Sequence, residues 1–183
     1  MPTVTRLFAF TSLLLSGAIF GFFYAWICST MWGLDGLDPR IAIAAMQAMN
    51  GSVRNIVFAP AFFATPFVLI LTAGLVWRKP LRRSAVLFGA AGLTYLIGGM
   101  ILTIAVNVPM NQALGQVTIP DDLTMAQQIW DDYSPKWQRY NVLRTVFSGI
   151  ALMLTGGGIY LLGVGSDQSK RRSAGFPDQN HGA

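Results

Sequence analysis

The sequence predicts an all-α membrane protein, a bundle of four transmembrane helices with an extra short helical segment in each outer loop. The first observation is composition, because 53% of the 183 residues are apolar and only 11% are charged, whereas about a quarter of an ordinary chain is charged. The second is charge placement. No Lys, Arg, Asp or Glu occurs in residues 7–34, 55–77, 84–120 and 145–166, and each stretch exceeds the roughly 20 residues that a helix needs to cross a bilayer.

These two observations exclude a water-soluble enzyme, a disordered chain and a disulfide-stabilised scaffold. They define one four-helix transmembrane domain, residues 1–164, followed by a polar tail, residues 165–183, that we expect to be disordered and cytoplasmic. The expected spans cover about residues 5–29, 53–77, 84–107 and 136–164. The first is a retained helix and not a signal peptide, because its apolar run is too long and no small-x-small cleavage site follows it.

Prolines and capping residues set the remaining helix limits. Asp38-Pro39 has the pattern of an N-cap followed by a first-turn proline, so we expect a helix from there to Asn50. The alternative is that this helix continues through Gly51 into the second span. Ser134-Pro135 repeats the signal and predicts the start of the fourth helix, after a separate short surface helix at 123–130. Further prolines are expected to bend the second span and to break the third helix; they are Pro60, Pro66 and Pro109.

Small residues predict where the spans pack closely. Gly17 and Gly21 have G-x-x-x-G spacing in the first span, and Gly98 and Gly99 lie together in the third. Because glycine lets membrane helices approach closely, we interpret these positions as helix contacts.

Basic residues predict the orientation in the membrane. They concentrate in the short connection at 78–83 and in the tail at 170–172, whereas the two longer connections carry most of the aspartates. Since cytoplasmic loops retain Lys and Arg, we expect a multi-pass protein of the plasma (inner) membrane with both termini in the cytoplasm. The basic clusters are topology signals, and we expect no nucleic acid partner.

The sequence predicts neither metal nor cofactor. Cys28 is the only cysteine, so the chain forms no internal disulfide. His181 is the only histidine and lies in the tail, which argues against haem, zinc, copper and di-iron sites held by histidine.

Polar residues near the outer ends of the helices predict a site. Trp137, Asn141, Arg144 and Ser148 are spaced four, three and four, so they share one helical face. An arginine this far into an apolar run either faces the bundle interior with a partner or extends to the membrane interface. If it is interior, we expect its partner to be Asn107, Asn111, Asn141 or an outer aspartate, such as Asp131 or Asp132.

Two further polar faces are candidates for the same site. Thr103, Asn107 and Asn111 are four residues apart, and the asparagines serve either as helix caps or as a polar wall opposite Arg144. Gln47, Asn50 and Arg54 also share a face. If all three faces point inward, the outer half of the bundle holds a pocket between the third and fourth helices.

Three motifs carry a family resemblance. They are Met46-Gln47-x-x-Asn50, Asn107-Val108-Pro109-x-Asn111, and Trp130-x-x-Tyr133-x-x-x-Trp137-x-x-x-Asn141-x-x-Arg144-Thr145. Over roughly residues 7–162 the chain resembles the anthrone oxygenase-like family of small four-helix membrane proteins, most of them uncharacterised. The resemblance implies cofactor-independent oxygenation of a lipophilic polycyclic phenol by dioxygen.

The implied chemistry assigns roles to the polar residues. Donors to an enolate or phenolate oxygen would be catalytic: Arg144, Asn107 and Asn141. Substrate would be bound by stacking and by amide contacts: Trp137, Asn111, Tyr133, Trp130, Gln47 and Asn50. The general base is either an outer aspartate or a water held by Asn111. The alternative function is a non-catalytic membrane protein that binds a lipophilic ligand or a partner helix. Ion transport is a weaker third reading, because the spans hold almost no ionisable residue.

Overall fold

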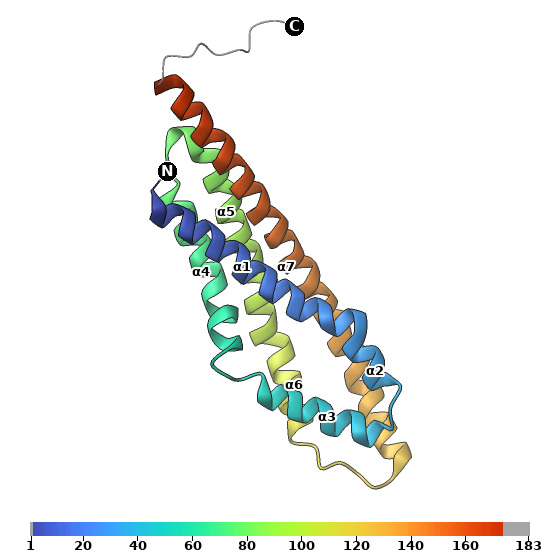
Figure 1. The fold of residues 1–183 in the computed structure, drawn as a ribbon. Coiled ribbons are helices and arrows are strands. Elements are labelled where there is room, and N and C mark those ends of the chain that lie inside the picture. The colour runs from blue at the N-terminus through green and yellow to red at the C-terminus, as the bar shows by residue number, and fades with distance from the viewer. Residues whose placement is uncertain (1, 174–183) are drawn as a thin grey trace, which may run out of the picture.

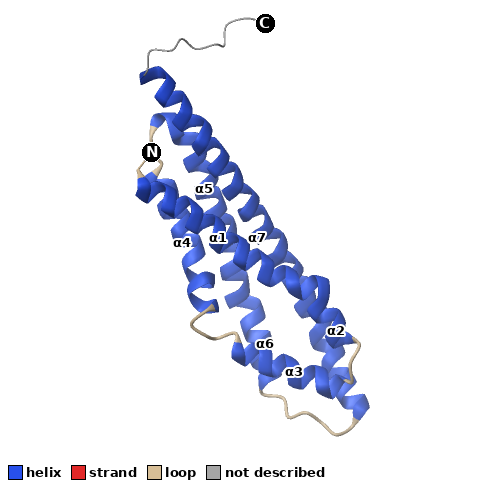
Figure 2. Cartoon of the chain, viewed as in Figure 1, coloured by secondary structure: helices blue, strands red, loops and turns tan. Residues whose placement is uncertain are grey.

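The chain folds into five helical runs, and the computed structural model describes residues 2–173. Helix α1 (Thr3–Ala25) continues through a π-helical turn (Trp26–Thr30) into α2 (Met31–Asp35). Helices α3 (Pro39–Ser52) and α4 (Phe58–Leu75) follow. A short 3₁₀ turn (Lys79–Leu81) leads to α5 (Arg82–Tyr95), which continues through two π-helical turns (Leu96–Ile101 and Thr103–Asn107) into α6 (Val108–Gly115). Helix α7 (Leu123–Ser173) completes the fold, and residues 2–173 contain no strand (Figures 1 and 2).

Four helical runs in the described range are long and apolar enough to cross a membrane: Thr3–Asp35, Phe58–Leu75, Arg82–Gly115 and Leu123–Gly165. The predicted fold class, an all-α bundle with four apolar spans, is confirmed. The runs identify the chain as an integral, multi-pass membrane protein. Three of them are longer than the expected spans, because they include the segments that pack together at the end of the bundle formed by α2, α3 and α6.

The two ends of the bundle differ. The N-terminus, the α4–α5 connection and the end of α7 lie together at one end, and α2, α3 and α6 lie at the other (Figure 1). Helix α3 lies across this second end and packs on α2, α6 and α7. The first described residues and the end of α7 at Ser173 therefore lie at the same end of the bundle.

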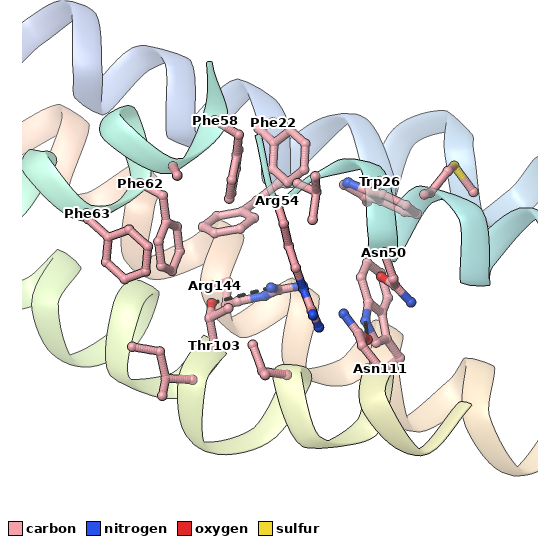
Figure 3. A pocket seen from close by; sticks show the side chains of 17 residues that line it. Phe22, Trp26, Asn50, Arg54, Phe58, Phe62, Phe63, Thr103, Asn111 and Arg144 are labelled. Atoms are coloured by element: carbon pink, nitrogen blue, oxygen red, sulfur yellow. Dashed lines mark hydrogen bonds between the residues drawn. The ribbon is translucent and has the colours of Figure 1, made fainter. Parts of the chain in front are cut away.

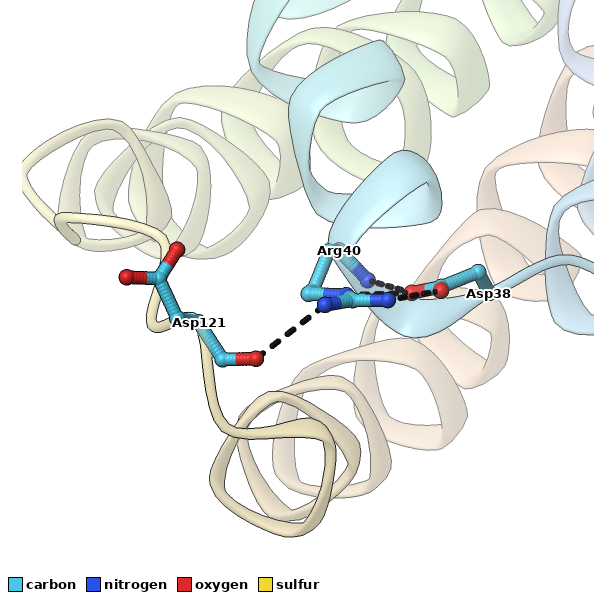
Figure 4. Close-up of polar contacts among 3 residues, drawn as sticks. All are labelled: Asp38, Arg40 and Asp121. Carbon is cyan, nitrogen blue, oxygen red and sulfur yellow. Dashed lines mark hydrogen bonds and ion pairs between the residues drawn. The ribbon is translucent and has the colours of Figure 1, made fainter.

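The start of α3 follows the predicted capping pattern. The Asp38 carboxylate accepts a hydrogen bond from the Arg40 backbone N–H at 2.9 Å, with Pro39 in the first turn. Arg40 also forms an ion pair with Asp38 at 2.6 Å and donates to the Asp121 carbonyl at 3.1 Å (Figure 4). This arginine thus connects the start of α3 to the loop that precedes α7.

Helix α3 does not continue into the second span. It ends at Ser52, and the Asn55 side chain accepts hydrogen bonds at 2.9 Å from the backbone N–H groups of Val57 and Phe58. This side chain satisfies the free donors at the start of α4. Helix α4 is therefore a span of only 18 residues, and it stops well short of the outer ends of its neighbours.

The third span does not break at Pro109. The chain passes through π-helical turns, in which the hydrogen bonds close over five residues instead of four, and Pro109 is the second residue of α6, directly after them. The wider turns accommodate Pro109 within one continuous helical run.

The helical segment expected at 123–130 is present, but it is the first part of α7 and not a separate helix. Pro135 lies inside α7, so the predicted start at Ser134-Pro135 is wrong. The reason is a carboxylate on another helix: Asp35 accepts hydrogen bonds at 2.7–2.9 Å from three α7 side chains. These donors are Trp130, Ser134 and Gln138. They lie on both sides of the proline and hold the helix continuous across it.

The far end of α7 also differs from expectation. The helix extends to Ser173, into the tail expected to be disordered. The rest of that tail, residues 174–183, lies outside the described residues.

Two apolar cores are stacked along the bundle. One lies among α1, α4, α5 and α7 and includes Phe23, Phe88 and Tyr95. The other lies among α2, α3, α6 and α7 and includes Met46 and Trp130. Aromatic side chains lie where the two cores meet; among them are Phe22 and Phe58 beside the first core and Trp26 beside the second.

The glycines divide into two groups. A methyl group on Gly98 would lie 2.0 Å from Cγ of Phe147, so this glycine allows close packing of the third span on α7, as predicted. Gly17 and Gly21 have no atom within 4 Å of such a methyl group. The expectation that they are helix contacts within this chain is therefore wrong, because this face of α1 has no neighbouring helix.

Candidate functional site

A cavity of about 400 Å³ lies between the two cores. It is bounded by all four spans and by the α3–α4 connection, and not only by the third and fourth helices as predicted. Most of its wall is apolar, and Figure 3 shows the rings and polar side chains that point into it. Seven of the lining side chains are aromatic: Phe22, Phe23, Trp26, Phe58, Phe62, Phe63 and Trp137. The cavity exists because α4 begins only at Phe58 and because α3, which precedes it, lies across the end of the bundle and not along it.

Arg144 lies in the wall of this cavity, inside the bundle. The residue is only 5% exposed, so the alternative in which its side chain extends to the membrane interface does not hold. Its Nη2 donates to Oδ1 of Asn141 at 2.9 Å, and its Nη1 donates to Oγ1 of Thr103 at 3.4 Å. Asn141 is among the partners that the sequence predicted, and Thr103 is not. The buried Nε has no partner, so the guanidinium retains unused donors.

Two aromatic rings stabilise the Arg144 charge. Its guanidinium carbon lies 4.7 Å from the centroid of the Phe23 ring and 5.2 Å from that of the Trp137 ring. Such cation–π contacts contribute roughly 0.5–2 kcal/mol each when desolvated. Among the described residues the one ion pair joins Asp38 to Arg40, so the aspartate that was one of the alternative partners for Arg144 is not found beside it. The charge has aromatic and amide partners but no counter-ion.

Asn111 fixes the orientation of the Trp137 indole. Its Oδ1 accepts hydrogen bonds from Nε1 of Trp137 at 2.9 Å and from the Tyr133 hydroxyl at 2.8 Å. The Tyr133 oxygen accepts a longer bond, 3.4 Å, from Nδ2 of Asn50. Three of these residues line the cavity, namely Asn50, Asn111 and Trp137, whereas Tyr133 lies behind them. The predicted polar faces on three helices therefore do meet in one network.

The other predicted site residues lie away from the cavity. Asn141 is buried, and its amide also donates to the Phe23 carbonyl at 3.0 Å. Gln47 donates to the carbonyl groups of Leu114 and Val117 at 2.8 and 3.0 Å and thereby holds the end of α6. Trp130 donates a hydrogen bond to Asp35 in the core among α2, α3, α6 and α7. These three side chains support the walls and do not line them.

Asn107 is fully buried, and neither atom of its amide has a hydrogen-bond partner. It lies four residues from both Thr103 and Asn111, which line the cavity, yet it is not itself a lining residue. It ends a π-helical turn, in which residues four apart no longer stack on one face. The predicted straight polar wall is therefore interrupted at its centre.

The sequence reasoning did not find the aromatic wall from the first two spans. Phe22, Trp26 and Phe58 line the main cavity, and they also line a second cavity of about 460 Å³ between α1 and the α3–α4 connection. Phenylalanine inside an apolar span gives no signal that separates a cavity wall from a core. Arg54 was placed on a face with Gln47 and Asn50, and it also lines the main cavity.

The residues present do not form a metal site in the described part of the chain. No group of three His, Cys, Asp or Glu side chains comes close enough there to hold an ion. The cavity wall contains none of these four residue types. Its chemistry is that of guanidinium, amide, hydroxyl and aromatic groups.

Residues 53–154 match the model of the anthrone oxygenase family, which covers more than half of the chain. The chain belongs to the anthrone oxygenase family. No curated protein and no solved structure matches it.

The match to the anthrone oxygenase family covers most of the site. It includes the two π-helical turns of the third span, Asn111, Trp137 and Arg144, and it begins at Val53, immediately before Arg54. The wall contributed by α1 lies outside the matched range. A buried guanidinium beside an aromatic cavity is suited to bind an oxygen atom that carries negative charge.

Proposed function

We propose that the cavity binds a lipophilic polycyclic phenol of the anthrone type and oxygenates it with dioxygen, without a cofactor. One observation carries the proposal: Arg144 is buried against an aromatic cavity, holds unused donors and has no counter-ion among residues 2–173. Small-molecule cavities span roughly 300–1,000 Å³, so about 400 Å³ suits a molecule of two or three fused rings. Membership of the anthrone oxygenase family supports the same substrate class.

The proposed reaction converts a methylene group to a carbonyl group. Loss of a proton from the central CH₂ gives an enolate that is aromatic, and this anion transfers one electron to dioxygen. The resulting superoxide and carbon radical combine to a peroxide anion, which takes up a proton from water to give a hydroperoxide. Loss of the remaining C–H proton and cleavage of the O–O bond then release water, so one oxygen atom enters the product and the other leaves as water.

In this reaction Arg144 stabilises the enolate oxygen. Asn141 and Thr103 hold the guanidinium in place through the hydrogen bonds described above, which makes the donor preorganised. Trp137 and the phenylalanine rings contact the faces of the substrate. The cavity wall contains no carboxylate or imidazole, so the first proton passes to water, and the free Nδ2 of Asn111 is the candidate to hold that water.

We also propose that the cavity opens on the outer side of the inner membrane, with both termini in the cytoplasm. The basic residues at 78–83 and 170–172 support this orientation. The second cavity supports entry of a lipophilic substrate from the bilayer, since it shares a wall with the first. Reporter domains fused after residues 80 and 120 are expected on opposite sides; a cytoplasmic reporter at 120 would contradict the orientation.

Oxygen consumption by the purified protein with an anthrone is the direct test of catalysis. Loss of one preorganised oxyanion donor costs about 10²–10³ in rate, so Arg144→Gln is expected to lose turnover by that factor. Arg82→Gln is the matched control, because Arg82 lies 5.3 Å from the Trp77 ring centroid and does not line the cavity. Wild type that consumes no oxygen with a panel of anthrones and naphthols would overturn the proposal.

The alternative is that the same cavity binds a lipophilic ligand without reacting. The aromatic wall favours binding in either case. Wild type that binds a naphthol tightly, with binding weakened by Arg144→Gln, but never consumes oxygen would select this alternative.

A further inference from the structure

Arg54 is a second guanidinium at the same cavity. It belongs to the connection between α3 and α4, and Figure 3 shows its side chain reaching into the cavity toward Arg144 and Asn111. Among the described residues its side chain forms neither an ion pair nor a side-chain hydrogen bond. The residue itself is exposed, whereas Arg144 is buried. The cavity therefore has one cation in its deep wall and another at its rim.

The cavity wall contains no carboxylate to balance these two cations. Ile56 and Val57, which follow on the same connection, do not line this cavity and are 90% and 80% exposed. An uncharged polycycle would leave Arg54 without a partner, although the side chain already lies along the cavity. A ligand with an acidic group at its outer end would bind it, since guanidinium matches a carboxylate in charge and geometry.

We infer that the cavity selects an aromatic ligand with two separated acidic groups, in which Arg144 holds a phenolate or enolate oxygen and Arg54 holds a carboxylate. This inference rests on the proposed function and narrows its substrate class from neutral polycyclic phenols to polycyclic phenols that carry an acid. Binding as an anion also reduces the need for a general base, which the cavity wall lacks.

Binding of a matched pair of probes tests the inference. The probes are 2-naphthol and 6-hydroxy-2-naphthoate, which differ by a carboxylate at the end opposite the hydroxyl. Affinities are measured by tryptophan fluorescence under nitrogen, in a non-ionic detergent. A charge-assisted hydrogen bond predicts that wild type prefers the naphthoate by roughly tenfold or more. In Arg54→Gln the ratio of the two affinities is expected to fall to about one; Arg54→Lys is expected to retain part of it, and Arg82→Gln all of it.

Three results would overturn the inference. The first is equal affinity of wild type for both probes, and the second is an unchanged preference in Arg54→Gln. The third is that phosphatidylglycerol, but not phosphatidylcholine, displaces the naphthoate from wild type, and that this displacement is lost in Arg54→Gln. In that case Arg54 binds a lipid headgroup. Failure of oxygenation is separate: a carboxylate preference that depends on Arg54, without oxygen consumption, leaves the inference standing and removes only the catalytic proposal.

Discussion

Nη2 of Arg144 lies 2.9 Å from Oδ1 of Asn141, and Nδ2 of the same amide lies 3.0 Å from the carbonyl oxygen of Phe23. One amide therefore connects the buried guanidinium on α7 to the backbone of α1. The Phe23 ring in turn contacts the guanidinium. The position of the cation is thus set by a contact between two helices as well as by its own helix.

This relationship predicts that Asn141→Leu is more destabilising than an ordinary substitution at the helix surface. The change removes the closer of the two hydrogen bonds to a buried charge and the bond from the same amide to the Phe23 carbonyl. Hydrogen bonds to charged groups contribute about 1.5–3 kcal/mol, so a loss of that size is expected in the free energy of unfolding in detergent. Val142→Ala is the control, because the neighbouring side chain is exposed. Equal losses in the two variants would contradict the role given to Asn141.

A second prediction concerns the close approach of the third span to α7. In Gly98→Ala the new methyl group would meet Cβ and Cγ of Phe147, which are not the flexible end of that side chain. Overpacking of this kind costs about 1–3 kcal/mol, and a lower melting temperature is expected. Gly21→Ala is the matched control: it meets no atom within 4 Å and is expected to be neutral or slightly stabilising. A melting temperature unchanged in Gly98→Ala would show that the helices can separate freely.

The four spans were predictable from the sequence because the cost of placing a charge in hydrocarbon dominates all other terms. The interior position of Arg144 was also favoured, since Trp137 and Asn141 share its face and a lipid-facing stripe would not be polar. Both inferences depend on local spacing along one helix. Both inferences are correct because they depend on whether a segment lies in an apolar or a polar environment, and not on contacts with a particular distant residue.

The limits of α7 and the position of the cavity depend on distant partners, and local signals did not reveal them. Ser134-Pro135 has the pattern of a helix start, but Asp35 binds donors on both sides of the proline and keeps the helix continuous. The cavity exists where Asn55 starts α4 late. A single sequence does not indicate which capping residue is used.

A third prediction concerns pH at the start of α3. The side chain of Arg40 donates hydrogen bonds to Asp38, and these, with the bond from the Arg40 backbone N–H, lower the pKa of the Asp38 carboxyl from its usual value. A lowered folded-state pKa means that the stabilisation is present above the unfolded pKa and is lost as pH falls through the folded value. Asp38→Asn is therefore expected to exchange the amide hydrogens of the first α3 turn faster than wild type at neutral pH. The difference in exchange rate between the variant and wild type should disappear at pH values below the usual range of carboxyl pKa values.

The partner variant checks the cause of that pH dependence. Arg40→Gln removes the cation and is expected to reproduce the faster exchange, while the double variant adds little to either single change. Additive effects of the two substitutions would mean that Asp38 acts as a helix cap alone.

The last prediction concerns Asn111, whose single oxygen accepts from both Trp137 and Tyr133. Asn111→Leu leaves an indole N–H and a phenol O–H, both in largely buried side chains, without their acceptor. Each unsatisfied donor costs about 1–3 kcal/mol, so a clear loss of stability is expected. Tyr133→Phe removes one donor and leaves the Trp137 bond intact, so its loss should be much smaller. Because the indole forms part of the cavity wall, Asn111→Leu is also expected to weaken 2-naphthol binding in the fluorescence assay, whereas Tyr133→Phe changes it little. If Tyr133→Phe weakens binding as much as Asn111→Leu, the phenol and not the orientation of the indole controls the site.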